Sequence, residues 1–297
     1  MKEENINKAV KASSKNQKVI RFFLFFLCFW IFFSQSCMRM RISDSKAQQN
    51  FAKKNMKVSF LNKDVKGFNL HYVKVGSDTL PTLFFIHGSP GSWNAFQEYM
   101  QDSSLLSVFR MISIDRPGFG YSNFGDAKDL PTNSNFIYAV IQKENNDKPL
   151  HLVGHSIGGT VVMQLAQDKP QRYASLTILA GSISPADEPK ENWRYVVHYS
   201  PLRWLWPGAL QPSNAEILYF KKDLKNLDTG YAKIKMPVMF IHGSADKFVT
   251  IKNVEYGLKK LAANKLVRSI IIPKANHFIP WQNYQVIKSH LLSLRGN

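Results

Sequence analysis

Short apolar segments recur along the chain after residue 57, and each is bounded by Gly, Pro or Asp. They lack strict alternation with polar residues, which is typical of strands buried on both faces of a parallel sheet. Segments with helical spacing lie between them. The expected strands are Val58–Leu61, Asn69–Val75, Leu83–Ile86, Met111–Ile114, Leu150–Val153, Leu176–Ala180, Val238–Ile241 and Val267–Ile272. The expected helices are Trp93–Gln101, Asn133–Glu144, Ile157–Gln167, Ala215–Leu224, Lys252–Ala262 and Asn283–Leu294.

This alternation of strand and helix predicts an α/β fold with a doubly wound, mostly parallel sheet. One gap interrupts it, because the 54 residues between Gly181 and Met236 contain no apolar strand segment. A long insertion in a compact domain commonly forms a lid or another functional element. We therefore expect a small helical cap at about residues 182–235. One of its tryptophans, Trp193, Trp204 or Trp206, should line the substrate entrance, unless all three pack the cap onto the sheet.

The N-terminal region has a different pattern. Residues 1–21 are polar and basic, and an uncharged run of 12 residues, FFLFFLCFWIFF, follows at 22–33. A bilayer-spanning helix needs about 20 apolar residues, so the run is more typical of a signal peptide. Cys37 follows the small Ser36, and this arrangement resembles a bacterial lipoprotein signal, in which the cysteine is lipidated after cleavage. The alternative is an uncleaved anchor over residues 19–38. Either way, residues 1–37 predict an exported protein held at a membrane.

Residues 38–56 are polar and basic, which predicts a flexible tether before a domain at 57–297. The chain has 297 residues, of which 44% are apolar, enough to bury a sizeable core.

The positive charge is concentrated near the N-terminus. Residues 1–57 contain twelve lysines and arginines and three acidic residues, so they carry half of the net charge of +18. The other basic residues are scattered and no nucleic-acid motif is present, so no nucleic-acid partner is expected. Two cysteines are too few for a disulfide-rich scaffold. The histidines lack the spacing of metal ligands, so no metal site is expected.

The first candidate for chemistry is Ser156, in the segment GHSIGG between an expected strand and an expected helix. This is the G-x-S-x-G pattern in the strand–turn–helix context that the motif requires. So tight a turn leaves no room for Cβ atoms next to the serine, and Gly154 and Gly158 supply none. The serine then lies at a helix N-terminus, whose dipole favours developing negative charge. A chance Gly-Ser-Gly loop is the alternative.

A second loop, HGSPGS at 87–92, follows the strand LFFI. Acyl transfer needs two backbone N–H groups directed at the oxyanion. Ile157, directly after the nucleophile, is expected to supply one, and Ser89 the other, because Pro90 has no N–H group. The alternative is that this segment is an ordinary turn between a strand and a helix.

Two later strand ends carry an acid and a base. Asp246 follows the strand PVMFIHG, and His277 follows the last strand. The chain order Ser156, Asp246, His277 is the order expected of an α/β-hydrolase. Asp246 would hold the imidazole in one tautomer, and His277 would take the serine proton. Asp246 as a helix cap and His277 as a surface histidine are the alternatives, with Asp187 as the reserve acid.

Together, the segments HGSPGS, DRPGFGYS, GHSIGG, HGSADKFV and the dipeptide NH resemble the α/β-hydrolase fold superfamily of single-domain serine hydrolases, over about residues 57–297. The resemblance implies that Asp115 and Arg116 are structural. Relatives with the DRPGFGYS turn include dehalogenases and epoxide hydrolases, which carry Asp where this chain has Ser156. HGSPG also resembles the HGGPG of proline iminopeptidases, but residues 182–235 show no clear match to the acidic cap features of those enzymes.

These observations predict a hydrolase that cleaves a carboxylic ester, or alternatively a thioester or an amide, through an acyl-enzyme on Ser156. The expected partners are a small ester-like substrate and a membrane, and no cofactor is expected. A non-catalytic α/β-hydrolase scaffold that binds a ligand is the main alternative. An aminopeptidase of the proline iminopeptidase type is a more distant one.

Overall fold

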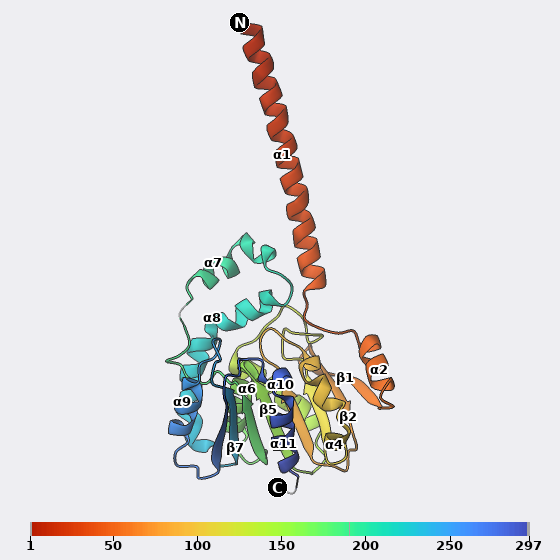
Figure 1. Ribbon diagram of the computed structural model, residues 1–297, viewed down its shortest axis with the longest axis vertical. Helices are drawn as coiled ribbons and strands as arrows, with labels where there is room; N and C mark the ends of the chain where they lie inside the picture. Colours follow the sequence, from red (N-terminus) through yellow and green to blue (C-terminus); the bar gives the residue numbers. More distant parts are fainter. Residues whose placement is uncertain (1, 190, 296–297) are drawn as a thin grey trace.

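The computed structural model describes residues 2–189 and 191–295, without the side chains of 2–14, 36 and 37. Its centre is an eight-stranded sheet in the order β1-β2-β4-β3-β5-β6-β7-β8 (Figure 1). β2 runs antiparallel to both β1 and β4, and the other neighbours are parallel, as predicted. The strands are β1 Val58–Val65, β2 Phe68–Val75, β3 Thr82–Ile86, β4 Arg110–Ile114, β5 Leu150–His155, β6 Ser175–Leu179, β7 Val238–Gly243 and β8 Val267–Ile272.

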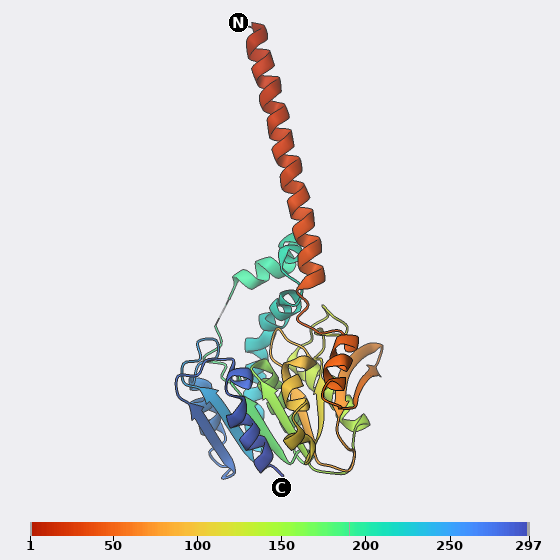
Figure 2. The same cartoon turned by 45° about the vertical axis from the view of Figure 1, so that its right-hand side comes forward.

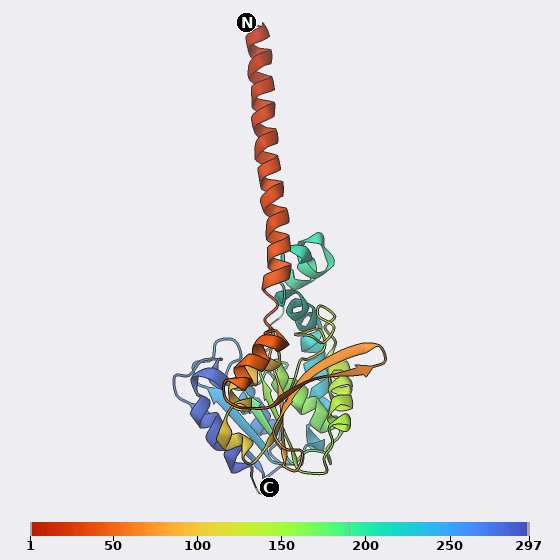
Figure 3. The ribbon, with the colours of Figure 1, turned by 90° about the vertical axis from the view of Figure 1, so that its right-hand side faces the viewer.

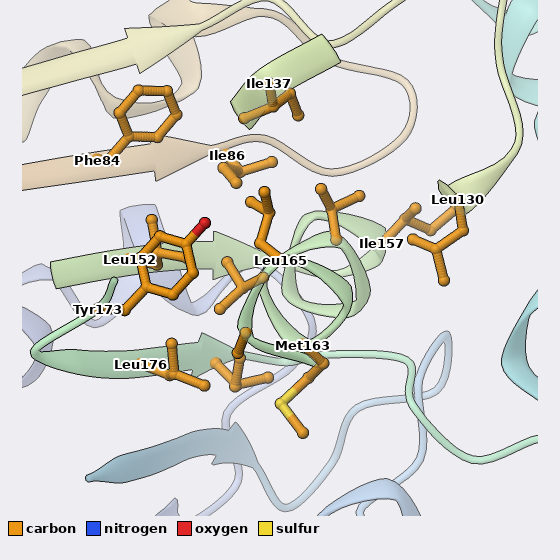
Figure 4. Packing of buried hydrophobic residues seen from close by; sticks show 14 of the residues in the cluster. Phe84, Ile86, Leu130, Ile137, Leu152, Ile157, Met163, Leu165, Tyr173 and Leu176 are labelled. Carbon is orange, nitrogen blue, oxygen red and sulfur yellow. The ribbon is translucent and has the colours of Figure 1, made fainter. Parts of the chain in front are cut away.

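The central strands β3, β4, β5 and β6 are buried at every position, which explains why they do not alternate between apolar and exposed polar residues. Their few polar side chains, such as Ser113 and Thr177, are buried as well. Alternate residues serve two separate cores. Phe84 and Ile86 belong to one, whereas Leu83 and Phe85 belong to the other. Figure 4 shows the first core, where side chains of β3, β5 and β6 meet those of the helices on one face of the sheet.

Helices cover both faces. The first core is closed by α5 Leu130–Lys143, α6 Ile157–Asp168, α8 Leu210–Leu227, η3 Asp228–Lys233 and α9 Lys252–Lys260. The second is closed by η1 Trp93–Phe96, α3 Gln97–Met100, α4 Ser103–Leu106, α10 Ile279–Gln282 and α11 Tyr284–Ser293. All expected helices are present, although Trp93–Gln101 is divided into η1 and α3, and α8 is longer than predicted at both ends.

Residues 38–56 differ from the predicted flexible tether. Helix α2, Asp44–Ala52, begins at the N-cap Ser43 and packs into the second core through Ala47 and Phe51, which are fully buried. Only these two apolar residues, one helical turn apart, mark its inner face. Because the segment is otherwise polar, its composition did not predict this short amphipathic helix. The packed domain therefore begins at α2, before residue 57.

The N-terminal helix α1, Lys2–Cys37, projects away from the domain (Figure 1). Within it, Lys15–Gln35 is a candidate membrane span of 21 residues, long and apolar enough to cross a bilayer. The feature is also typical of a signal sequence near an N-terminus. The predicted lipidation site concerns the side chain of Cys37, which lies outside the described side chains.

The insertion between β6 and β7 is helical. It contains α7 Trp193–Tyr199, η2 Pro201–Leu205, α8 and η3. The segments α7, η2 and α8, which we call the cap, lie above the carboxyl ends of the parallel strands (Figures 1 and 2). The cap therefore overhangs the sheet edge at which β5, β7 and β8 end.

Buried histidines predict an acid-sensitive fold. Burial and the nearby His290 lower the pKa of His151 to about 4. Between that value and the ordinary histidine pKa of about 6.5, only the unfolded chain binds the proton, so stability falls as pH decreases through this window. Through His151, the wild-type protein should lose up to about 3 kcal/mol in the free energy of unfolding between pH 7 and pH 4, and His151→Gln should remove this loss. Urea unfolding of the full-length protein in detergent at several pH values measures the free energy of unfolding. The same pH dependence in the variant and the wild-type protein would contradict the expectation.

Candidate active site

Ser156 lies at the turn between β5 and α6, in a conformation that few non-glycine residues adopt. Its φ is 55° and its ψ is −125°. A Cβ atom on Gly154 would overlap the backbone of Gly158, and a Cβ on Gly158 would overlap the carbonyl of Ile86. The two glycines therefore allow the strand, the turn and the neighbouring strand β3 to approach closely, and the turn places Ser156 at the N-terminus of α6.

His277 and Asp246 meet beyond the ends of β8 and β7. The Nδ1 atom of His277 lies 2.7 Å from Oδ2 of Asp246, whose side chain is fully buried. The other oxygen of Asp246 accepts hydrogen bonds of 2.9 Å from the backbone N–H groups of Phe248 and Val249. In the described residues, the carboxylate bonded to His277 is that of Asp246, and Asp187 lies elsewhere in the insertion. Such a pairing leaves Nε2 of His277 as the proton acceptor.

Asp246 is held as a carboxylate. Burial raises its pKa, but hydrogen bonds from His242, His277 and the Val249 amide lower it further, so the net pKa lies well below the usual range. The ring of His242 lies 3.4 Å from Oδ2 of Asp246 and 2.8 Å from the carbonyl oxygen of Val249. The negative charge beside His277 therefore persists through the neutral and mildly acidic pH range.

His155 is a further histidine at this centre. Its Nε2 lies 3.0 Å from the carbonyl oxygen of His277, and burial together with the nearby His277 lowers its pKa to about 3. The neutral ring therefore donates from Nε2 and fixes the backbone of His277. No role for His155 or His242 follows from the sequence motifs alone. Their positions, one residue before Ser156 and four before Asp246, were the available signal.

The HGSPGS loop lies directly against Ser156. A Cβ atom on Gly88 would approach the Cβ of Ser156 to 3.0 Å, and both Ser89 and Ile157 line the same cavity as Ser156. His87 is fully buried, and its Nδ1 donates to the Gly88 carbonyl at 2.6 Å. Burial and the neighbouring Arg116 lower the pKa of His87, so its uncharged ring holds the loop.

Arg116 connects this loop to the cap. Its guanidinium is fully buried and bonds both carboxylate oxygens of Glu216, at 2.7 and 3.0 Å. The same side chain donates to the carbonyl oxygens of His87 at 2.9 Å and Gly88 at 3.2 Å. Asp115 is equally buried and accepts from the N–H groups of Trp93 and Tyr121. Both residues organise backbone segments, which supports the structural role that the sequence resemblance implied.

A cavity of about 770 Å³ opens between the cap and the sheet edge and is lined by Ser156, His277, Ser89 and Ile157. The prediction that one of the cap tryptophans lines the substrate entrance is wrong. Trp204 and Trp206 line a separate cavity of about 250 Å³, and Trp193 packs edge-on against Trp206. The aromatic side chains of Phe248, Phe278 and Trp281 line the main cavity instead.

The cavity also contains acidic groups from the insertion, which no sequence motif indicates. Glu188 and Glu191 both line it. Burial raises the pKa of Glu188, while Glu191 is paired with Arg194 at 2.6 Å. Among the described residues, no group of three or more His, Cys, Asp or Glu side chains is arranged to hold a metal ion.

The sequence is similar to those of known hydrolases. Residues 81–205 match the family model of the alpha/beta hydrolase fold. The chain is 31% identical over 150 residues to a pimeloyl-[acyl-carrier protein] methyl ester esterase of Vibrio parahaemolyticus, a match covering 50% of this chain and 51% of that protein. It is 30% identical over 115 residues to epoxide hydrolase 1 of Caenorhabditis elegans, covering 38% and 28%. The matches thus span about half or less of these relatives.

Among solved structures, a membrane phospholipase A described as a bacterial virulence factor is similar over 96% of this chain and 100% of its own. The TM-score is 0.65 and the sequence identity 18%. A likeness at this identity shows the fold. The mostly parallel sheet, the turn at Ser156 and the similar structures agree on the predicted fold class.

Proposed function

This chain has the α/β-hydrolase fold, and on that premise we propose that it is a serine hydrolase that cleaves a carboxylic ester through an acyl-enzyme on Ser156. The observation that carries the proposal is the pairing of His277 with the buried carboxylate of Asp246, in the cavity that Ser156 lines. A histidine held in this tautomer presents a free Nε2 lone pair, as a general base requires.

In the proposed reaction, Nε2 of His277 takes the proton of Ser156 as Oγ attacks the ester carbonyl. The backbone N–H groups of Ser89 and Ile157 stabilise the oxyanion. The C–O bond breaks and the alcohol leaves with the proton from His277. Water then attacks the acyl-enzyme by the same route, so an ester and one water molecule yield an acid and an alcohol. The reaction needs no cofactor.

The ester is favoured over the thioester and the amide because one relative is a methyl ester esterase. A specific observation favours a second candidate, an aminopeptidase. Glu188 lines the cavity, and a carboxylate there would attract a substrate amine. Release of an N-terminal amino acid from a peptide, with an activity lost in Glu188→Gln, would identify the aminopeptidase.

A fluorophosphonate probe tests whether the site is catalytic at all. The expected result is covalent labelling of Ser156, mapped by mass spectrometry. In a separate assay, the unlabelled protein should release alcohol from a water-soluble ester at neutral pH. A folded protein that takes up no label between pH 6 and 9, about the range in which imidazole is neutral, would favour the non-catalytic scaffold instead.

We further propose that residues 1–37 hold the protein in a membrane as an uncleaved helix. Cleavage before Cys37 would remove residues that bond the cap. Trp30 donates to the Leu205 carbonyl at 3.2 Å, and Gln35 donates to the Trp206 carbonyl at 2.7 Å. The lipoprotein remains the alternative, and Cys37 would then carry the anchor.

Substitution of Cys37 by serine separates these two forms of attachment. An uncleaved helix does not depend on a thiol, so Cys37→Ser should remain in the membrane pellet after alkaline carbonate washing and retain the mass of the full chain. Cys28→Ser, in the same helix, is the matched control. Release of the Cys37→Ser protein into the supernatant, or a wild-type mass lacking the first 36 residues, would show that the lipoprotein alternative is right.

A further inference from the structure

The cap exposes a group of large apolar and aromatic side chains. Helix α7 and η2 expose between 44% and 68% of six large side chains: Trp193, Tyr195, Val196, Tyr199, Leu202 and Trp204. We call these six residues the cap face. An exposed group of large apolar residues marks an interaction site, and tryptophan and tyrosine are enriched where proteins meet the headgroup region of a bilayer.

The cap face is continuous with α1. Trp30 and Gln35 bond backbone carbonyls at the end of η2, and the N–H group of Gly208 donates to the Ser34 carbonyl at 3.0 Å. η2 contacts α1, and Figures 2 and 3 show the cap beside the last turns of this helix. A bilayer that contains α1 therefore reaches the cap face.

The depth of α1 fits this arrangement. The segment Lys15–Gln35 has 21 residues, which corresponds to about 31 Å of helix and matches the hydrocarbon thickness. Trp30 and Gln35 lie near its C-terminal end, at the depth where the hydrocarbon core gives way to headgroups. The parts of η2 and α8 that they contact then lie at the membrane surface.

The entrance of the active-site cavity is close to this surface. Met40 lines the cavity and is only three residues beyond Cys37, the last residue of α1. Three residues extend over about 11 Å at most. Phe248, Phe278 and Trp281 also line the cavity and expose 76%, 44% and 43% of their surfaces. An acyl chain that leaves the bilayer for Ser156 would contact these apolar side chains.

We propose that the cap face rests on the bilayer and that the substrate is an acyl ester of a membrane lipid, taken directly from the adjacent leaflet. The inference depends on the proposed serine hydrolase mechanism. Oγ of Ser156 would bond the acyl carbon and the lipid alcohol would leave with a proton. Water would then release the fatty acid and restore the serine, so no oxidant or other co-reactant is needed.

The test compares two substrates of the full-length protein reconstituted in vesicles of dioleoyl phosphatidylcholine and phosphatidylglycerol. One is the vesicle phospholipid itself, followed by release of oleate, and the other is p-nitrophenyl butyrate in the aqueous phase. Val196→Asp and Tyr199→Asp place a charge on the cap face. We expect oleate release to fall by about tenfold or more, because a carboxylate resists entry into the apolar layer. Hydrolysis of the butyrate ester should change by less than about twofold.

Leu266→Asp is the matched control. Leu266 is 53% exposed and immediately precedes β8, at the strand end opposite to the one that leads to His277, so this change should leave both rates unaltered. Wild-type protein that hydrolyses the butyrate ester but not the vesicle lipid would overturn the lipid inference and leave the proposed function intact. Failure to hydrolyse either substrate would count against the proposed function itself. If the cap variants instead alter the oligomeric state and leave oleate release unchanged, the cap face is an interface between chains and the inference is wrong.

Discussion

Replacing Ser156 by alanine is expected to lower kcat for an ester by roughly 10³- to 10⁶-fold while the protein stays folded. Only the attacking oxygen is removed, and alanine fits wherever serine fits in the turn between β5 and α6. The measurement is steady-state hydrolysis of a water-soluble ester, with unfolding by urea as the check on the fold. A variant that retained a tenth of the wild-type rate would show that Ser156 is not the nucleophile.

The same experiment extends to His277 and Asp246. His277→Ala should lose about as much activity as Ser156→Ala, and the double variant little more, because groups that act as one unit do not contribute additively. Additive losses would contradict a shared mechanism.

Asp246→Asn has a specific structural consequence. The oxygen that accepts from the N–H groups of Phe248 and Val249 must remain an oxygen, so the new amide NH₂ would face His277. Nδ1 of His277 could then only accept, and its proton would move to Nε2. We expect a loss of up to about 10⁴-fold in kcat from this wrong tautomer. A KM effect without a kcat effect would exclude this explanation.

Removal of the Glu216 carboxylate is the second change expected to have a large effect. Arg116 is completely buried, and its charge is balanced across the cap boundary by Glu216. Glu216→Ala leaves that charge unpaired, and we expect a loss of about 3–5 kcal/mol in the free energy of unfolding. Because Arg116 also holds the carbonyls of His87 and Gly88, the loop that carries Ser89 should shift and kcat should fall as well.

Replacing both residues of the pair tests whether the loss comes from the unpaired charge. Arg116→Met combined with Glu216→Leu should recover much of the stability lost in Glu216→Ala, because an apolar pair no longer needs its charge balanced. The matched control is the partly exposed pair of Lys260 and Asp228, at 2.7 Å, where Lys260→Ala should cost less than about 1 kcal/mol. Equal losses from Glu216→Ala and Lys260→Ala would mean that burial does not set the strength of the Arg116 pair.

The sequence by itself determined the sheet and the position of Ser156. A strand buried on both faces is mostly apolar, so β3 to β6 could be located from local composition. The turn at Ser156 depends on Gly154 and Gly158, only four residues apart, and the order Ser156, Asp246, His277 follows from the order of the strand ends. These features are local, or they follow from the repeated strand–helix unit, so a single chain records them.

The tertiary structure decided what depends on contacts between distant segments. Arg116 and Glu216 are 100 residues apart, and nothing in either local sequence indicates that they bond. His155 and His242 acquire their roles only because β5, β7 and β8 end at the same edge. Helix α2 presents two apolar residues to the core, too few for a pattern. The contact of α1 with the cap joins Trp30 and Leu205, which are 175 residues apart. The free energy of such contacts depends on burial and on the partner, which local sequence does not specify.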